Sequence, residues 1–273
     1  MGALRTSELV SVSYFLLLAV MAWTRPVPRP VRLRTGAVAV GVAAGVVFVA
    51  GATGSEPSAG GAAIRDWLPL LLLLLAYWLP SALVTGPLLP LERVLLAIDR
   101  RVLGSAAGRA VTRAPRPFRE LLELGYLAVY PMVPLAFALL FSAGFRSSAD
   151  RFWSTVLTAE YLCYVLLPLL PTRPPREIER DRAYGGRGAA ARTLNFCILD
   201  RASNRWNTFP SGHVAGAAAS ALALLPLLPA AGAALLALTA LTAVGSVAGR
   251  YHYAADAASG LAVACLAFLL FAL

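Results

Sequence analysis

The chain has 273 residues, of which 59% are hydrophobic and 14% are charged, and its mean hydropathy is +0.70. This composition excludes an ordinary soluble domain and indicates a protein that crosses a membrane several times. All 24 basic residues are arginine, and against 14 acidic residues they give a net charge of +10, which favours anionic lipid headgroups as neighbours. No basic run is interleaved with aromatic residues, so nucleic-acid binding is not expected, and the three cysteines form no C-x-x-C pair.

Eight apolar segments approach the roughly 20 residues that a helix needs to cross the hydrocarbon of a bilayer. They predict an all-α fold, a multi-pass membrane helical bundle with about eight transmembrane helices, and a location in the cell membrane. The first segment lacks a convincing cleavage site, so we expect a retained anchor rather than a signal peptide. In chain order the segments are about 9–24, 36–53, 66–85, 121–144, 151–170, 212–228, 231–248 and 254–273.

The connections between these segments differ in character. Residues 25–35 are read as a short basic loop, and residues 54–63 as a join rich in Gly, Ser and Ala. Residues 86–118 are too polar to span, but apolar residues recur there at helical spacing, which predicts a helix lying on the membrane surface. Residues 171–211 are read as a long loop that carries eight arginines.

His252 and Asp256 lie one helical turn apart, and the chain has only one other histidine, His213. On a helix, positions i and i+4 share a face. The Asp256 carboxylate can then accept a hydrogen bond from one ring nitrogen of His252 and leave the other free as a nucleophile. Taken alone, the pair is better explained by a His and an Asp that simply satisfy each other near a helix start.

The stretch from Asn207 to His213 ends in Pro210-Ser211-Gly212-His213, directly before an apolar segment. Ser211 is a good N-cap, and a helix N-terminus offers free N–H groups and positive dipole charge to an anion. His213 can donate a proton to a leaving oxygen from this position. A capped helix start with an interfacial histidine also fits these residues.

Arg173 and Arg176 follow the fifth apolar segment in a stretch stiffened by prolines. Two guanidinium groups held there can fork onto phosphate oxygens, although positive charge at a membrane surface also accounts for them. With eight spans, the arginines and both histidine motifs fall on the same side of the membrane, so we expect them to converge on one phosphate. A metal site is disfavoured because the arginines repel a cation and no third strong ligand is evident. No cofactor is expected.

Taken in order, these motifs resemble those of the type-2 phosphatidic acid phosphatase superfamily, whose fold is shared with vanadium haloperoxidases. The resemblance covers roughly residues 66–273 and implies a six-helix catalytic core over residues 61–273. An N-terminal pair of transmembrane helices in residues 1–60 would be an addition to that core. The motifs that carry the resemblance are Arg173-Pro174, Pro210-Ser211-Gly212-His213 and His252-x3-Asp256.

The resemblance also implies a role for each matching residue. His252 attacks phosphorus and forms a phosphohistidine, and Asp256 orients it. His213 protonates the leaving oxygen and then activates water. The phosphoryl oxygens are held by Arg173, Ser211 and the Gly212 N–H.

The chain departs from the family pattern at two positions. Leu166 stands where the first motif has a lysine, and Ser246 stands where the third motif has an arginine. We expect Arg176 and Arg250 to substitute for these residues, because a phosphate needs sufficient positive charge around it. With these departures the chain also resembles the inositol-phosphotransferase branch, which keeps His-x3-Asp while its other motif positions vary. In that branch the acceptor is an alcohol rather than water.

The sequence therefore predicts an integral-membrane lipid phosphatase for a lipid phosphate or polyprenyl (di)phosphate that enters from the bilayer. One alternative is a phosphotransferase that moves a phospho-headgroup onto an alcohol. Another is a non-catalytic transporter or scaffold, against which the intact histidine pair argues. The basic loops favour a cytoplasmic active site, whereas the resemblance implies the extracytoplasmic side for most lipid phosphatases. Glu160, midway along the fifth segment, is a functional candidate that we leave outside the site.

Overall fold

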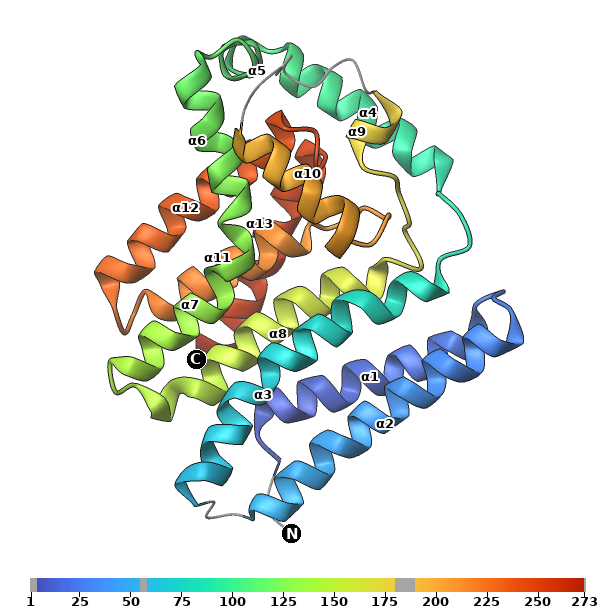
Figure 1. Cartoon of the computed structure of the whole chain (residues 1–273), viewed down its shortest axis with the longest axis vertical. Helices are drawn as coiled ribbons and strands as arrows, with labels where there is room; N and C mark the ends of the chain where they lie inside the picture. Colours follow the sequence, from blue (N-terminus) through green and yellow to red (C-terminus); the bar gives the residue numbers. More distant parts are fainter. Residues whose placement is uncertain (1–3, 55–57, 180–189, 273) are drawn as a thin grey trace.

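The computed structural model describes residues 4–54, 58–179 and 190–272, and these ranges are built from helices without a named strand (Figure 1). The all-α, multi-pass bundle that the sequence predicts is confirmed. The helices are α1 (Thr6–Thr24), α2 (Arg29–Thr53), α3 (Ala59–Trp78), η1 (Leu79–Leu83), α4 (Leu89–Gly104), α5 (Ala106–Thr112), α6 (Arg116–Leu127), α7 (Val129–Ser142), η2 (Arg146–Ser148), α8 (Ala149–Leu166), α9 (Pro175–Ile178), α10 (Ala190–Ala202), α11 (Gly212–Leu224), α12 (Pro229–Ala248) and α13 (Ala254–Ala272).

Five helices in the described part of the chain are long and apolar enough to cross a membrane: α1, α2, α3 with η1, α12 and α13. The pair α6 and α7 passes the same test together but is bent by 60°. Pro131 explains the bend, because it has no N–H for the carbonyl of Leu127 and its ring crowds that carbonyl. The eight predicted segments are these helices, the bent pair, α8 and α11; α8 carries three charged residues and α11 has only 13 residues.

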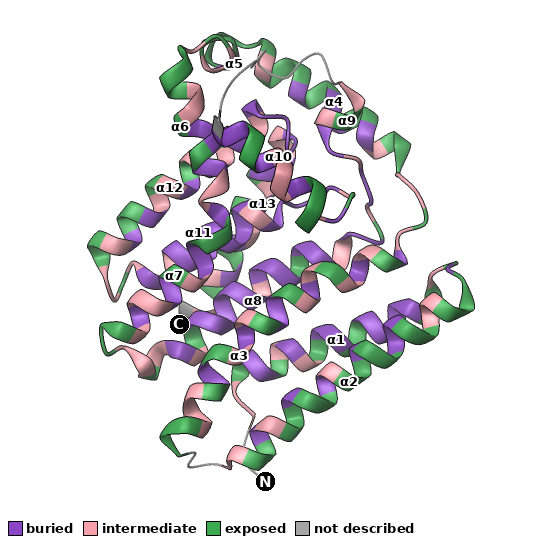
Figure 2. Cartoon of the chain, in the orientation of Figure 1, coloured by how far each residue is buried: buried purple, intermediate pink, exposed green. Residues whose placement is uncertain are grey.

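Helix α8 lies at the centre of the bundle, and Figure 2 shows most of its length as buried. It packs against α11 and α13 on one side and against α1 and α3 on another. Helix α1 also packs along α2, so the N-terminal helices join the same bundle as the later ones. At the start of α8, the indole N–H of Trp153 donates to the carbonyl of Asp66 (2.7 Å), which fixes α3 against α8.

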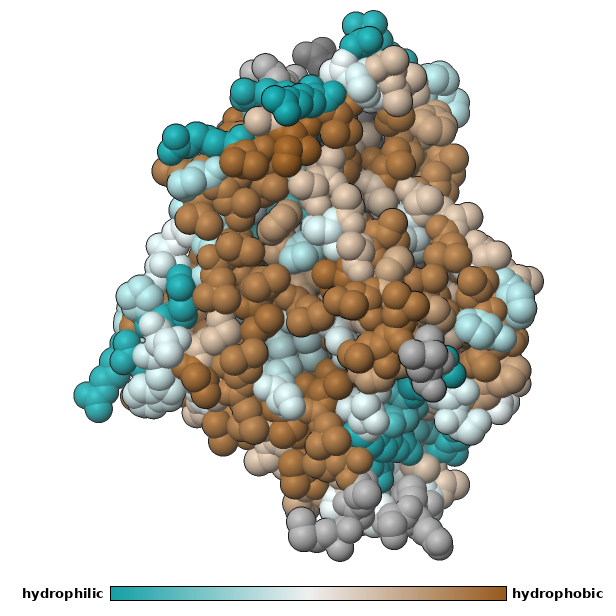
Figure 3. All heavy atoms as spheres, turned by 180° about the vertical axis from the view of Figure 1, so that it is seen from behind, coloured by the Kyte–Doolittle hydropathy of each residue, from teal (hydrophilic) through white to brown (hydrophobic). Residues whose placement is uncertain are grey.

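Large apolar side chains cover the outside of the bundle. Phe48 is 72% exposed, Leu270 66% and Leu74 62%. Figure 3 shows hydrophobic residues across the middle of one face, with hydrophilic residues gathered toward its ends. A soluble monomer does not leave so extensive an apolar surface in water. The chain is therefore an integral membrane protein.

The polar stretch before α6 forms the predicted surface helix, α4, followed by the short α5. Leu95 and Leu96 pack against Tyr253 in the bundle, whereas Val94 and Ile98 remain exposed. One apolar side of α4 thus faces the protein, and another faces outward at the end of the bundle that carries α9 and α10 (Figure 1).

Two predicted loops contain more helix than expected. Residues 25–35 were expected to be a loop, but α2 begins at Arg29. Its second residue, Pro30, does not prevent this, because proline is well tolerated in a first helical turn. Residues 171–211 were also expected to be a loop, but they contain α10, whose Leu199 packs with Tyr126 and Tyr251. Three of the eight arginines in that stretch, at 180, 182 and 187, lie outside the residues that the structure describes.

Candidate active site

Three segments that are far apart in sequence meet where α8 ends and where α11 and α13 begin. The amide of Asn207 donates to the carbonyl of Thr172 (2.7 Å), and the amide of Ser211 donates to the carbonyl of Asp256 (3.0 Å). These bonds tie the segment before α11 both to the segment after α8 and to the first turn of α13. The structure thus places the proline-rich segment and both histidine motifs at one end of the bundle.

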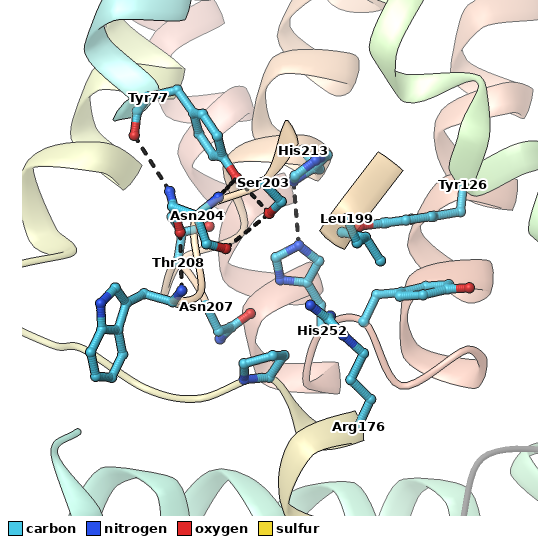
Figure 4. Close-up of a pocket in the computed structure, with 13 residues that line it drawn as sticks. Tyr77, Tyr126, Arg176, Leu199, Ser203, Asn204, Asn207, Thr208, His213 and His252 are labelled. Atoms are coloured by element: carbon cyan, nitrogen blue, oxygen red, sulfur yellow. Dashed lines mark hydrogen bonds between the residues drawn. The ribbon is translucent and has the colours of Figure 1, made fainter. Parts of the chain in front are cut away.

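The two histidines face each other across a small pocket (Figure 4). Nε2 of His252 lies 3.4 Å from Nδ1 of His213, and the ring centroids are 5.3 Å apart. The other ring nitrogen of His252, Nδ1, lies 3.5 Å from Oδ2 of Asp256. One nitrogen of His252 therefore faces a carboxylate while the other faces the pocket and the second histidine.

The backbone that holds His252 differs from the prediction, which placed His252 and Asp256 on one helix. Helix α13 begins at Ala254, and His252 lies in the turn that follows α12. The His252 amide donates to the carbonyl of Ser246 (3.1 Å), and Arg250 adopts a left-handed φ of 65°. The turn therefore sets the distance between His252 and Asp256, and helical periodicity does not.

Asp256 is fully buried and is held by its own helix terminus. Its Oδ2 accepts a hydrogen bond from the amide of Tyr253 (2.9 Å), the residue that precedes α13. A carboxylate in the first turn that bonds back in this way satisfies an otherwise free N–H group. The same oxygen accepts a hydrogen bond from Nδ2 of Asn207 (2.7 Å). The side chain of Asp256 is thus oriented by two hydrogen bonds from different segments.

The start of α11 has the predicted cap. Ser211 is the N-cap, and its Oγ accepts the amide of Val214 (3.3 Å). The amide of Gly212 donates to Oγ1 of Thr208 (3.3 Å). The polar groups predicted to hold phosphoryl oxygens, on Ser211 and Gly212, therefore have partners within the chain, and neither residue lines the pocket. His213, the next residue, does line it.

The pocket is narrow, and two larger spaces adjoin it. Its own volume is about 20 Å³, close to the room of one water molecule. A cavity of about 560 Å³ shares Arg176 and Asn204 with it, and we call this the polar cavity because it is also lined by Asp200 and Arg205. A groove of about 400 Å³ shares His213 with the pocket. We call it the apolar groove, because residues of α3 and α7, three leucines and two valines among them, line most of it.

Comparison with known families identifies the chain from these same segments. The PAP2 superfamily matches residues 93–270, which run from within α4 to within α13 and include every residue of the pocket from Tyr126 onward. This chain belongs to the PAP2 superfamily. PAP2 proteins are phosphatases and phosphotransferases, so the chain is a membrane enzyme of this broad type. No curated protein and no solved structure matches the chain significantly.

The three arginines expected around the PAP2 phosphate have different surroundings. Arg176 lines the pocket, and its guanidinium lies over the ring of Tyr251 (5.9 Å to the centroid). Figure 4 shows its side chain extending toward His252. Arg173 instead forks onto Glu92 of α4, with Nη2 2.8 Å from Oε2 and Nε 3.1 Å from Oε1.

Arg250 is buried and forms ion pairs with Asp99 of α4 and with Glu179 (2.9 Å). It does not line the pocket. The structure therefore brings only Arg176 of the three to the histidines. Arg173 and Arg250 attach the segments that carry the site to α4 and to the residues after α9.

The environment of His252 favours its neutral form. Burial lowers the pKa of His252, and the positive charge of Arg176 lowers it further. An imidazole with a lowered pKa keeps a free lone pair at neutral pH, which a nucleophile requires. His213 packs beside Tyr126, with ring centroids 5.8 Å apart, and Tyr126 stacks on Tyr251 at 4.1 Å. This stack fixes the plane of His213 next to His252.

Several residues of the site carry no signal in the sequence. Tyr77 lies in the apolar helix α3, Tyr126 lies near the end of the amphipathic helix α6, and Asn204 lies in a stretch that was read as loop. Tyr77 bonds through its hydroxyl to Ser203 (2.8 Å) and so closes one side of the pocket. Asn207 was noted only as the first residue of the histidine motif, and a lone asparagine gives no hint that it reaches Asp256.

We expect Asn207→Ala to lower kcat about 10- to 100-fold, because Asp256 loses a strong hydrogen bond and with it part of its orientation. Thr172→Val is the matched control. It removes Thr172 Oγ1, the other acceptor of the side-chain Nδ2 of Asn207 (3.0 Å), but leaves the hydrogen bond from Nδ2 to Asp256. Steady-state rates of phosphate release from a lipid phosphate in detergent micelles measure both. Wild-type kcat in the Asn207→Ala protein would show that Asp256 needs no such support.

Proposed function

We propose that this PAP2 protein is a lipid phosphatase of the cell membrane that transfers a phosphoryl group first to His252 and then to water. The observation that carries the proposal is the facing pair of His252 and His213 in a pocket that contains Arg176 and adjoins an apolar groove. A nucleophile, a proton donor and a cation around one small space are what transfer of a phosphoryl group requires.

In the first step, Nε2 of His252 forms a bond to phosphorus, and the bond between phosphorus and the lipid oxygen breaks. His213 gives the leaving oxygen a proton from Nδ1, the atom that faces His252. Asp256 stabilises the positive charge that develops on the ring of His252. In the second step, water attacks phosphorus, His213 takes a proton from that water, and inorganic phosphate leaves His252 neutral again. Arg176 balances the negative charge of the phosphoryl oxygens in both steps.

The apolar groove supports a lipid as the substrate. It begins at His213 and is lined by side chains such as Leu74 and Trp78, which are 62% and 44% exposed on the outside of the bundle. A hydrocarbon tail can therefore lie in the groove and leave it sideways into the bilayer, while its phosphate reaches the histidines. A water-soluble phosphate ester has no hydrocarbon tail that such a groove could bind.

The polar cavity favours a second candidate function, transfer of the phosphoryl-bearing group to an alcohol. It adjoins the pocket beside Arg176, and Asp200, Arg205 and Asn204 supply acceptors and donors to it. A polyol bound there would place a hydroxyl near the site where the first proposal has water. The reaction would use the same two histidines.

A panel of substrates tests the two functions. Purified protein in micelles is given phosphatidate, phosphatidylglycerol phosphate or a polyprenyl phosphate, with and without inositol or glycerol. Release of inorganic phosphate that polyols do not change supports the phosphatase. A phosphorylated polyol as the product establishes the phosphotransferase instead. Absence of any reaction with all lipids contradicts both.

A further inference from the structure

The apolar groove contains one carboxyl group, that of Glu160, which the proposed reaction does not use. Glu160 lies in the middle of α8 and is 8% exposed. Its Oε2 accepts a hydrogen bond from the hydroxyl of Tyr164 (2.6 Å), and no arginine lines the groove. A carboxyl group in apolar surroundings without a cationic partner costs free energy, and inside a membrane protein it marks a functional position by default.

The contact between α8 and α11 fixes the depth of Glu160 relative to His213. A Cβ on Gly212 would lie 2.5 Å from the ring of Tyr164, and a Cβ on Gly216 would lie 1.8 Å from Oε1 of Glu160. Only glycine at these two positions, one helical turn apart, lets Tyr164 and Glu160 lie against α11. The Glu160 carboxyl is therefore level with Gly216, three residues after His213, which is about 4.5 Å along the helix at 1.5 Å per residue.

This position corresponds to a definite part of a lipid phosphate. When the phosphate is at His213 and the tail runs along the groove, the group at the level of Glu160 is the linkage between phosphate and hydrocarbon. In a glycerolipid that linkage carries ester carbonyl oxygens a few bonds from phosphorus, whereas in a polyprenyl phosphate it is hydrocarbon. A carboxyl group in its acid form donates a hydrogen bond, and a carbonyl oxygen accepts one.

We propose that Glu160, held by Tyr164 against Gly216, is a specificity-determining residue that binds the ester carbonyl oxygen of a glycerolipid phosphate in the apolar groove. This proposal rests on the proposed lipid phosphatase activity and adds the choice among lipids. Glu160 selects substrates by the linkage next to the phosphate, and the apolar lining accepts the tail of any of them.

Two substrates that differ only in the carbonyl oxygens provide the test. One is phosphatidate with two ester-linked chains, and the other is the same glycerol phosphate with two ether-linked chains of equal length. We expect wild-type kcat/KM for the diester to exceed that for the diether about tenfold or more, as a buried hydrogen bond allows. Glu160→Leu should remove this preference by lowering the diester rate alone, and Glu160→Gln, which keeps a donor, should retain most of it.

Val133→Ala is the matched control, since Val133 lines the same groove without a polar group. It should lower both rates by the same factor and leave the preference unchanged. Activity of the Glu160→Leu protein on the diether shows that the variant is folded. Measurable wild-type rates that are equal for diester and diether, or a preference that survives Glu160→Leu, would overturn the proposal.

A binding measurement separates this proposal from the proposed function. Native mass spectrometry of the full chain carrying His252→Ala compares retention of the diester and the diether, with and without Glu160→Leu. Preferential binding of the diester that Glu160→Leu abolishes supports the Glu160 site even when wild-type protein releases no phosphate, a result that would contradict only the phosphatase. Equal binding of both lipids contradicts the Glu160 site.

Discussion

The His252→Ala protein is expected to release phosphate from its lipid substrate at no more than about 10⁻⁴ of the wild-type rate, because loss of the attacking group removes the covalent route entirely. The residual rate comes from Arg176 and the pocket, which still bind the phosphate. The effect should appear in kcat, since Nε2 of His252 makes its bond to phosphorus only during the reaction.

A trapping experiment checks this expectation beyond the loss of rate. Protein mixed with lipid carrying ³²P in its phosphate is denatured in base, which preserves a phosphohistidine, and the label on the protein is counted. Wild-type protein should carry label, and His252→Ala should carry none. His213→Ala should carry more than wild type, because removal of the group that activates water slows the second step. The chain has only these two histidines, so the two variants decide which of them carries the base-stable, acid-labile label.

Label that persists at its wild-type level in the His252→Ala protein would contradict His252 as the nucleophile. Wild-type phosphate release by the same protein would do so as well. If His213→Ala lost all label, His213 would be needed for the first step to a degree that leaves no phosphohistidine to trap.

The bundle could be predicted from the sequence because the signals that define it are local. A run of about 20 apolar residues predicts a helix wherever it occurs, and Pro210-Ser211 predicts the start of α11 without reference to the rest of the chain. The bend between α6 and α7 was not predicted, since residues 121–144 were read as one segment, although Pro131 is a local signal for it. Helix α10 was missed because its 13 residues mix apolar and polar side chains and are too few to cross a membrane. Its Asn195 and Leu199 are buried against α6 and Tyr251, which no local pattern reveals.

The site could be predicted in outline but not in its electrostatics. Counting spans placed both histidines at one end of the bundle, and the structure agrees. The partners of the arginines could not be predicted, because Glu92 and Asp99 belong to α4, about 80 residues before Arg173 and about 150 before Arg250. A guanidinium near a motif looks the same in sequence whether it binds substrate or a carboxylate of another helix.

Arg176 and Arg173 lie close together in sequence, but only Arg176 lines the pocket, so their removal should have different effects. Arg176→Ala should lower kcat/KM by about 10²- to 10³-fold, the typical cost of removing a group that stabilises charge in the transition state. Arg173→Ala is the matched control, being a neighbouring arginine outside the pocket. It should lower kcat/KM no more than a few-fold, because its guanidinium is engaged with Glu92 and 42% exposed. Arg176→Lys should restore part of the rate, since a point charge replaces a planar fork.

The pH dependence distinguishes a direct role of Arg176 from a loss of structure. Protonated His252 cannot attack, so activity falls as pH drops through its pKa. Because Arg176 helps to lower that pKa, Arg176→Ala should raise it and move the acid limb of kcat/KM to higher pH, while Arg173→Ala should leave the limb in place. A larger loss with Arg173→Ala than with Arg176→Ala would mean that Arg173 leaves Glu92 to bind the phosphate when substrate enters. An unshifted limb in Arg176→Ala would mean that burial alone holds His252 neutral.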